Sequence, residues 1–315
     1  MTSIALITVY HFNSSKADSY ARLVRGLRSM ARQLGPNDKL ILVANGIRDG
    51  AEDPDKVLKE VDSAHPERIE PVVILNNIHA SGGLNVGISA ALRQRCHWIG
   101  SVQSSVVVGA GWLETMRSKA HSSKADGFAG RLVYEEQPDT IWSEGHYLKC
   151  GLTQDIRYNR ALNDPGEIGD RWAFPCLSAA LFSAKTVQSV VDNYGNFVTE
   201  RLPHYGDCTD VALRCARLGH KAFSLVEDAR GTKRRPHRER AEIMCSQLLA
   251  AQRYYSDRFE EVRKSLEDSK YVRFLDDALR CALNLDSGQY SPKNQPPPKA
   301  SNLEDQEWGA SISPN

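Results

Sequence analysis

Short apolar segments alternate with stretches of helical periodicity through the first half of the chain. Apolar runs of strand length predict strands at residues 4–9, 39–43, 72–75 and 98–102. The stretches between them predict helices at residues 15–34, 55–61 and 83–95. This alternation indicates right-handed crossovers and an α/β fold with a mostly parallel, twisted sheet between helices. Ligands bind such sheets beyond the carboxyl ends of the strands, so a site is expected around residues 8–11, 44–49, 76–79 and 103–105.

The second half of the chain is less regular. Strands are predicted at residues 127–134, 178–182 and 222–226, and helices at 185–191 and 207–218. The polar connection over 135–171 is long enough to form an acceptor loop. Residues 241–283 have a helical pattern, and the Pro- and Ser-rich end is expected to be disordered. We therefore expect a domain over 1–237, a helical extension packed on it over 238–286, and a disordered tail over 287–315.

Composition indicates an ordinary globular chain. Of its 315 residues, 41% are hydrophobic and 25% charged, and 40 Lys and Arg nearly balance 39 Asp and Glu, which argues against nucleic acid as a partner. No apolar run is long enough to span a membrane, and the N-terminus lacks the pattern of a signal peptide. The seven cysteines are scattered without a Cys-x-x-Cys pair, which predicts reduced thiols rather than disulfides or a zinc site. The expected location is the cytoplasm.

Five short motifs follow one another in a fixed order. They are residues 5–10 with Asn13, 42–50 (Leu-Val-Ala-Asn-Gly-Ile-Arg-Asp-Gly), 76–87 with its Asn-Val-Gly end, 98–113 with Gly-Trp-Leu at its end, and 205–214 (Tyr-Gly-Asp-Cys-Thr-Asp-Val-Ala-Leu-Arg). This ordered set resembles the family 2 glycosyltransferases, in particular rhamnosyltransferase-like members, over roughly residues 4–237. The resemblance implies a GT-A fold and transfer of a sugar from a nucleotide-sugar donor.

The resemblance also assigns site residues. It implies that a donor pocket is shaped by Thr8, Tyr10, Asn45, Asp49 and Asn85, with Gln103 and Ser105 at the position of the family's metal-binding Asp-x-Asp. It further implies a base at the start of the helix after residue 206, where Asp207 is the residue of choice and Cys208 stands at the usual position. Asp207 is also placed to cap that helix, and both roles remain open.

Acidic residues are absent where the family needs them. Positions 44, 103, 105 and 208 hold Ala, Gln, Ser and Cys, and no Asp or Glu occurs from Pro71 to Leu113. Because Mg²⁺ and Mn²⁺ prefer anionic oxygen ligands, we expect no protein metal ligands and only weak binding of either ion. Activity is therefore expected to be metal-independent or weakly metal-dependent.

Three further patterns have alternative interpretations. The glycines at 82, 83 and 87 lack the spacing of a dinucleotide fingerprint and the acidic residue that should follow it. Asp210 and Arg214 lie four residues apart, so a surface ion pair is as good an interpretation as a functional one. The basic stretch 230–238 offers Arg234, Arg235 and His237 as phosphate contacts, against the alternative of a solvated loop.

The sequence thus predicts an inverting glycosyltransferase that uses a nucleotide sugar. Its acceptor is an unidentified small molecule, glycan or lipid-linked compound. The alternative is a catalytically inactive protein of the same fold that binds a nucleotide sugar or a partner protein, as the four lost acidic positions suggest.

Overall fold

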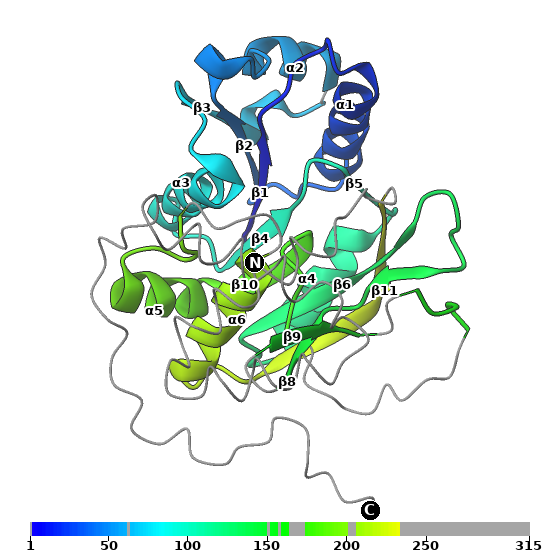
Figure 1. Ribbon diagram of the computed structural model, residues 1–315, viewed down its shortest axis with the longest axis vertical. Helices are drawn as coiled ribbons and strands as arrows, with labels where there is room; N and C mark the ends of the chain where they lie inside the picture. The colour runs from blue at the N-terminus through cyan, green and yellow to red at the C-terminus, as the bar shows by residue number, and fades with distance from the viewer. Residues whose placement is uncertain are drawn as a thin grey trace, which may run out of the picture.

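The computed structural model describes residues 2–61, 64–149, 152–156, 159–163, 174–200 and 206–233. Within these ranges the chain forms an α/β fold around one large sheet (Figure 1). Its strands are β1 Ile4–Tyr10, β2 Lys39–Asn45, β3 Ile69–Ile74, β4 Trp98–Val102, β5 Val106–Val108, β6 Gly127–Tyr134, β7 Ile141–Ser143, β10 Ala179–Ser183 and β11 Phe223–Lys233. The helices are α1 Ala17–Ala31, α2 Pro54–Val61, α3 His79–Arg93, α4 Trp112–Ser122, α5 Ala184–Tyr194 and α6 Asp207–Arg217.

The order of the strands is β3-β2-β1-β4-β10-β6-β11-β5, with β7 paired to β6. Strands β3, β2, β1 and β4 are parallel, whereas β10 runs antiparallel to both of its neighbours, β4 and β6. Strand β11 is parallel to β6, and β5 returns antiparallel on β11. A separate hairpin is formed by β8 His146–Lys149 and β9 Leu152–Asp155. The predicted mostly parallel α/β sheet is therefore confirmed.

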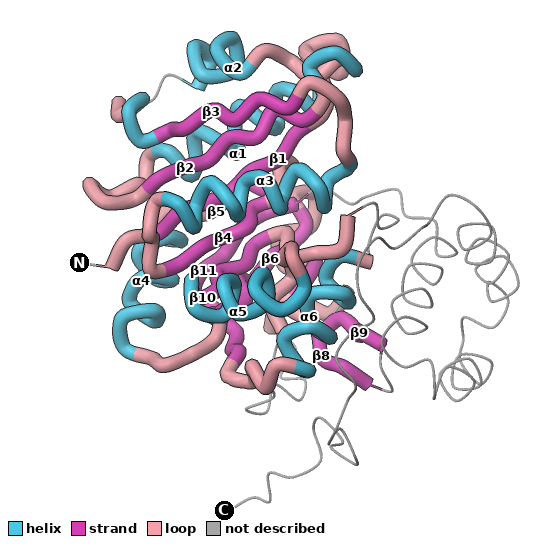
Figure 2. The backbone as a smooth tube through the Cα atoms, turned by 90° about the vertical axis from the view of Figure 1, so that its left-hand side faces the viewer, coloured by secondary structure: helices cyan, strands magenta, loops and turns pink. Residues whose placement is uncertain are grey.

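Helices cover both faces of the sheet, and each face has its own core. Alternate residues of β1 divide between them: Ile4 and Leu6 pack with α1, α2 and α4, while Ala5 and Ile7 pack with α3, α5 and α6. Figure 2 shows α3, α5 and α6 on one side of the sheet. This alternation follows from the two-residue period of a strand, and it explains why β1 is apolar at nearly every position.

Two glycines let α3 lie close to the sheet. A Cβ atom on Gly87 would come within 2.4 Å of Ile7 Cγ2, and one on Gly83 within 2.6 Å of Val9 Cγ1. Both distances are shorter than non-bonded carbon atoms can approach in a packed core. The Asn-Val-Gly motif at 85–87 thus includes a glycine that close packing of helix and strand requires.

Most of the predicted elements are present, with shifted ends. Strands β4 and β6 match their predicted bounds, but β11 continues to Lys233, well past the predicted end at Val226. The short strands β5, β7, β8 and β9 and helix α4 were not predicted. The predicted helical extension and tail lie outside the described residues, and the domain boundary at 237 stays a prediction. Within the described ranges, no helix is long and apolar enough to cross a bilayer.

Asp210 and Arg214 form a buried ion pair, so the expectation of a surface pair is wrong. Arg214 Nε lies 2.9 Å from Asp210 Oδ2, and both side chains are only 1% exposed. Asp210 accepts hydrogen bonds from the Thr199 backbone N–H (2.7 Å) and hydroxyl (2.9 Å). Arg214 donates to the carbonyl of Asn196 (2.7 Å) and stacks on the ring of Tyr194. The pair therefore anchors the chain before α6 to the helix itself.

Replacing Asp210 by Asn should destabilise the protein by about 3–5 kcal/mol, because Arg214 would stay buried without its counter-charge. Urea denaturation followed by circular dichroism measures this change. The matched control is Asp192→Asn on the exposed side of α5, which should change the free energy of unfolding by less than about 0.5 kcal/mol. Equal effects of the two substitutions would contradict the anchoring role of Asp210.

Candidate functional site

Three strand ends meet at one edge of the sheet. Strand β4 ends there at Val102, and β11, which runs in the same direction, ends there at Lys233. Because β10 is antiparallel, its first residue Ala179 pairs with Val102, so the chain enters β10 at this same edge. Segments far apart in the sequence are thereby brought together around Gln103, Ser178 and Lys233.

The ammonium group of Lys233 lies beside Gln103, one of the two residues that the family resemblance puts at the Asp-x-Asp position. Its Nζ donates hydrogen bonds to Gln103 Oε1 and, at 3.0 Å, to Ser178 Oγ. Ser178 Oγ itself donates to Gln103 Oε1 at 3.0 Å. The ammonium also lies 3.9 Å from the ring centroid of Trp142, which is a cation–π contact. The neutral residue of the expected Asp-x-Asp position is thus paired with a buried cation.

Asp207 is the first residue of α6, beside this group. Its Oδ1 accepts a hydrogen bond from the N–H of Cys208 at 2.9 Å, and the side chain is half-buried. Cys208 Sγ accepts a hydrogen bond from the N–H of Leu177 at 3.4 Å. This contact joins the start of α6 to the segment that enters β10. It places the predicted base and the thiol that follows it at the same sheet edge as Gln103.

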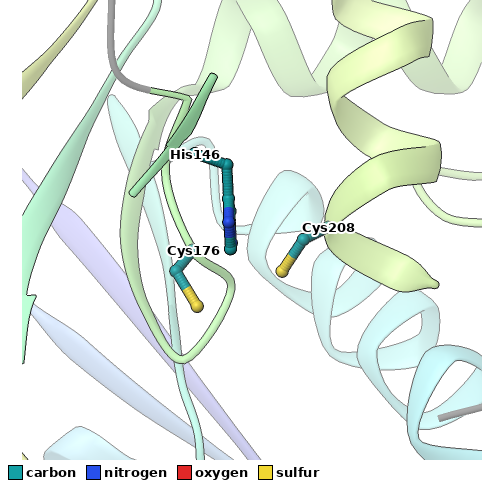
Figure 3. A group of neighbouring side chains, drawn as sticks. All are labelled: His146, Cys176 and Cys208. Atoms are coloured by element: carbon teal, nitrogen blue, oxygen red, sulfur yellow. The ribbon is translucent and has the colours of Figure 1, made fainter. Parts of the chain in front are cut away.

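A second group of side chains adjoins Asp207. The ligand atoms of His146, Cys176 and Cys208 all lie within 4.8 Å of one another (Figure 3). His146 begins β8, Cys176 lies in the segment before β10, and Cys208 is in the first turn of α6. In the close-up the imidazole of His146 lies between the two thiols. We call these three residues the His-Cys-Cys cluster.

The electrostatics of the two groups are linked. Burial raises the pKa of Asp207 and Cys176 adds to this, whereas the backbone N–H of Cys208, Lys233 and His146 oppose it. A hydrogen bond from Cys208 lowers the pKa of Cys176, with His146 and Lys233 acting in the same direction. The same hydrogen bond, together with burial, raises the pKa of Cys208. The charge on Lys233 therefore acts on both Asp207 and Cys176.

The predicted donor residues of β1 have buried side chains. Thr8 is fully buried, and its hydroxyl donates to the carbonyl of Val102 at 3.0 Å. Tyr10 is 1% exposed, and its hydroxyl donates to the carbonyl of Glu52 at 2.7 Å. These side chains hold neighbouring segments together in the core. Only the backbone of this strand is therefore left to contact a donor.

Asn45 and Asp49 both organise the turn after β2. The buried amide of Asn45 donates to the carbonyl of His79 at 2.9 Å and accepts from the N–H of Ile78 at 3.1 Å. Asp49, which is exposed, accepts a hydrogen bond from the N–H of Asn77. Of the two, Asp49 keeps a side chain at the surface, so it alone of this pair remains accessible to a ligand.

Asn85, which the resemblance assigns to the donor pocket, uses its side chain to contact the backbone of a distant segment. Its side chain is buried within α3, where Nδ2 donates to the carbonyl of Val198 at 2.8 Å. Its Oδ1 accepts from the N–H groups of Phe197 at 3.2 Å and Val198 at 3.1 Å. An amide so engaged with backbone ties α3 to the chain before α6, and this structural role leaves its oxygen no free direction toward a ligand.

The other predictions have mixed outcomes. Ser105 lies half-buried in the turn after β4, where the N–H of Val106 donates to the carbonyl of Gln103 at 2.8 Å. Arg234, Arg235 and His237 lie outside the described residues. The sequence did not single out Lys233 as a site residue, because the closing strand was predicted to end at Val226 and not at Lys233. It missed the His-Cys-Cys cluster because its members are 30 or more residues apart and match no spacing motif.

Three solved structures have a similar fold. Residues 1–349 of S. aureus TarS match with a TM-score of 0.54 at 10% identity, over 90% of this chain and 81% of that one. The same fragment in complex with UDP-GlcNAc matches with a TM-score of 0.53 at 11% identity, over 90% and 82%. Mannosyltransferase PcManGT from Pyrobaculum calidifontis, in complex with GDP-Man and Mn²⁺, matches with a TM-score of 0.51 at 11% identity, over 92% and 76%.

The fold is therefore that of the GT-A glycosyltransferases, as the sequence predicts. No protein-family model matches the sequence, and no curated protein matches it. At these identities the structural likeness establishes the fold and not the activity of this chain.

The contact between Lys233 and Gln103 changes what is needed to build a metal site here. Gln103→Asp with Ser105→Asp should create Mn²⁺ affinity, but the nearby ammonium will oppose the ion. Adding Lys233→Met should tighten Mn²⁺ binding at least about 10-fold, because a unit charge ~4 Å from a divalent ion costs about 2 kcal/mol even in water. Calorimetric titration with Mn²⁺ compares the two variants. Absence of Mn²⁺ affinity in both would show that this turn does not hold the metal position.

Proposed function

We propose that this protein is an inverting glycosyltransferase that uses a nucleotide-sugar donor and does not need a bound divalent ion. The observation that carries the proposal is the buried ammonium of Lys233 at the end of β11, hydrogen-bonded to Gln103, which directly follows β4, in a GT-A fold. In the family that the sequence resembles, this position supplies positive charge to the nucleotide diphosphate. Lys233 supplies the same sign of charge from the protein.

The leaving group needs that charge because negative charge develops on it as the glycosidic bond breaks. A cation ~4 Å from a phosphate oxygen contributes about 1 kcal/mol in water and about 4 kcal/mol in a partly buried site. Lys233 is 7% exposed and lies in contact with an indole ring, so its charge is only weakly screened by solvent. Arg234, Arg235 and His237 follow it directly in the sequence and are proposed as further phosphate contacts.

Asp207 is the proposed base. The acceptor hydroxyl oxygen attacks the anomeric carbon, and the bond between that carbon and the diphosphate oxygen breaks with its electron pair on the leaving group. The acceptor proton passes to the Asp207 carboxylate. The support is its place at the first turn of α6, at the sheet edge that also holds Gln103 and Lys233. The acceptor is a hydroxyl compound of unknown class: a small molecule, a glycan or a lipid-linked acceptor.

One observation favours the alternative of an inactive protein with this fold. Of the residues predicted to shape a donor pocket, Thr8, Tyr10 and Asn45 use their side chains within the core. A panel of UDP-, GDP- and TDP-sugars, titrated with and without added Mn²⁺, separates the two functions. Binding with slow release of sugar supports the transferase, whereas failure to bind any nucleotide supports a protein that binds only a partner.

Removal of the Lys233 charge should weaken donor binding. Lys233→Met keeps the length of the side chain, and we expect the Kd of the bound nucleotide sugar to rise about 10-fold, which corresponds to about 1.4 kcal/mol. Lys233→Arg should restore most of the affinity. The matched control is Lys185→Ala on the exposed start of α5, which should leave the Kd unchanged. An unchanged Kd for Lys233→Met at unchanged thermal stability would remove Lys233 from the proposed role.

Removal of the Asp207 carboxylate should act on the reaction and not on the donor. Asp207→Asn should lower kcat by a factor of about 100 or more, since general bases contribute about 10²–10⁴-fold. Its donor Kd should stay within about twofold of the wild-type value. Asp228→Asn, an exposed position on β11, serves as the control for loss of a carboxylate. Turnover equal to that of the control would assign the base to another residue.

A further inference from the structure

We infer that His146, Cys176 and Cys208 bind a zinc ion. The sequence predicts reduced thiols without a zinc site, because no pair of cysteines has the spacing of a zinc motif. The structure assembles the ligands from three separate segments instead: the start of β8, the segment entering β10 and the first turn of α6. This inference concerns a site separate from the Lys233 position and does not depend on sugar transfer.

The geometry is close to that of a tetrahedral site. With Zn–S bonds of about 2.3 Å and a Zn–N bond of about 2.0 Å, tetrahedral ligand atoms lie about 3.5–3.8 Å apart. The imidazole nitrogen and the two sulfur atoms lie within 4.8 Å of one another. Each separation therefore exceeds the tetrahedral value by about 1.3 Å at most, which small rotamer changes can close. Figure 3 shows the Cys176 and Cys208 side chains on either side of the His146 ring, with the three ligand atoms grouped together.

The ligand types select zinc. Two thiolates and one imidazole are soft or borderline donors, which suit Zn²⁺ and not the Mg²⁺ or Mn²⁺ of an Asp-x-Asp motif. A set of two Cys and one His leaves one of four positions to water or to another oxygen ligand, as in catalytic zinc sites. Asp207 immediately precedes Cys208 and interacts electrostatically with both Cys176 and His146.

The charges around the cluster also favour a dication. Two thiolates and Zn²⁺ sum to zero with a neutral imidazole, so a zinc-bound cluster carries no net charge into a largely buried region. Lys233 and Asp207, which act on the cluster from outside, carry opposite charges and balance one another. Loading the cluster therefore leaves no uncompensated charge among these five side chains.

The test uses the full-length protein, reduced and freed of metal under anaerobic conditions. Addition of Co²⁺ should give the charge-transfer absorption of cobalt–thiolate bonds with one ion per chain, and Zn²⁺ should displace it. Cys208→Ser and Cys176→Ser should each reduce the intensity of this absorption, since each removes one thiolate. Each should also weaken zinc binding by at least about 100-fold, because loss of even an outer-shell partner costs about 10–100-fold.

The matched control is Cys96→Ser, a buried cysteine outside the cluster, which should leave both the spectrum and the zinc affinity unchanged. His146→Gln gives a second ligand variant that keeps both thiols. The titration of the wild-type protein needs no variant to fold, so it tests the site by itself. Absence of a cobalt–thiolate band in the reduced wild-type protein would overturn the inference. So would equal zinc affinity in Cys96→Ser and Cys176→Ser.

Discussion

The reversed direction of β10 is the constraint on which the site depends. This strand lies between β4 and β6 and is antiparallel to both, so its first residue is placed beside the last residue of β4. The chain before it therefore runs along the carboxyl edge of the sheet. Ser178 then meets Gln103, and Leu177 meets Cys208. In a wholly parallel sheet, this segment would lie at the opposite edge and neither contact would form.

Lys233 interacts with both sets of side chains at this edge of the sheet, the Gln103–Ser178 pair and the residues around Asp207. It holds Gln103 and Ser178 through hydrogen bonds and is close enough to act on Asp207 and Cys176. In a metal-dependent glycosyltransferase, the cation arrives with its own charge and is held by carboxylates. Under the proposed function the Lys233 ammonium on β11 takes the place of that cation, so carboxylates at positions 103 and 105 would have no dication to hold. The proposal therefore gives one explanation for both the missing carboxylates and the presence of Lys233.

The sequence predicted the layers of the fold better than the roles of single residues. Apolar periodicity located β1, β4 and β6 because strands buried on both faces leave a clear pattern. The same periodicity predicted an end of β11 at Val226. The strand continues beyond it through Glu227, Asp228 and Arg230, whose polar side chains break the apolar pattern. Asn85 illustrates the limit for sites: its partners are backbone groups of residues 197 and 198, over 110 positions away. Spacing along the chain carries no information about such contacts, nor about the His-Cys-Cys cluster.

The close approach of α3 to β1 bears on how relatives of this chain are recognised. Gly87 is needed because Ile7 occupies the space that a Cβ atom would fill. This packing requirement is the same whether or not the protein transfers a sugar. Descendants that lose every reactive group would still keep this glycine, since they must still fold. A sequence search based on this glycine would therefore find active enzymes and inactive relatives alike. Under the proposed function, position 233 is the better discriminator, because selection for a lysine there would cease once the protein no longer bound a diphosphate.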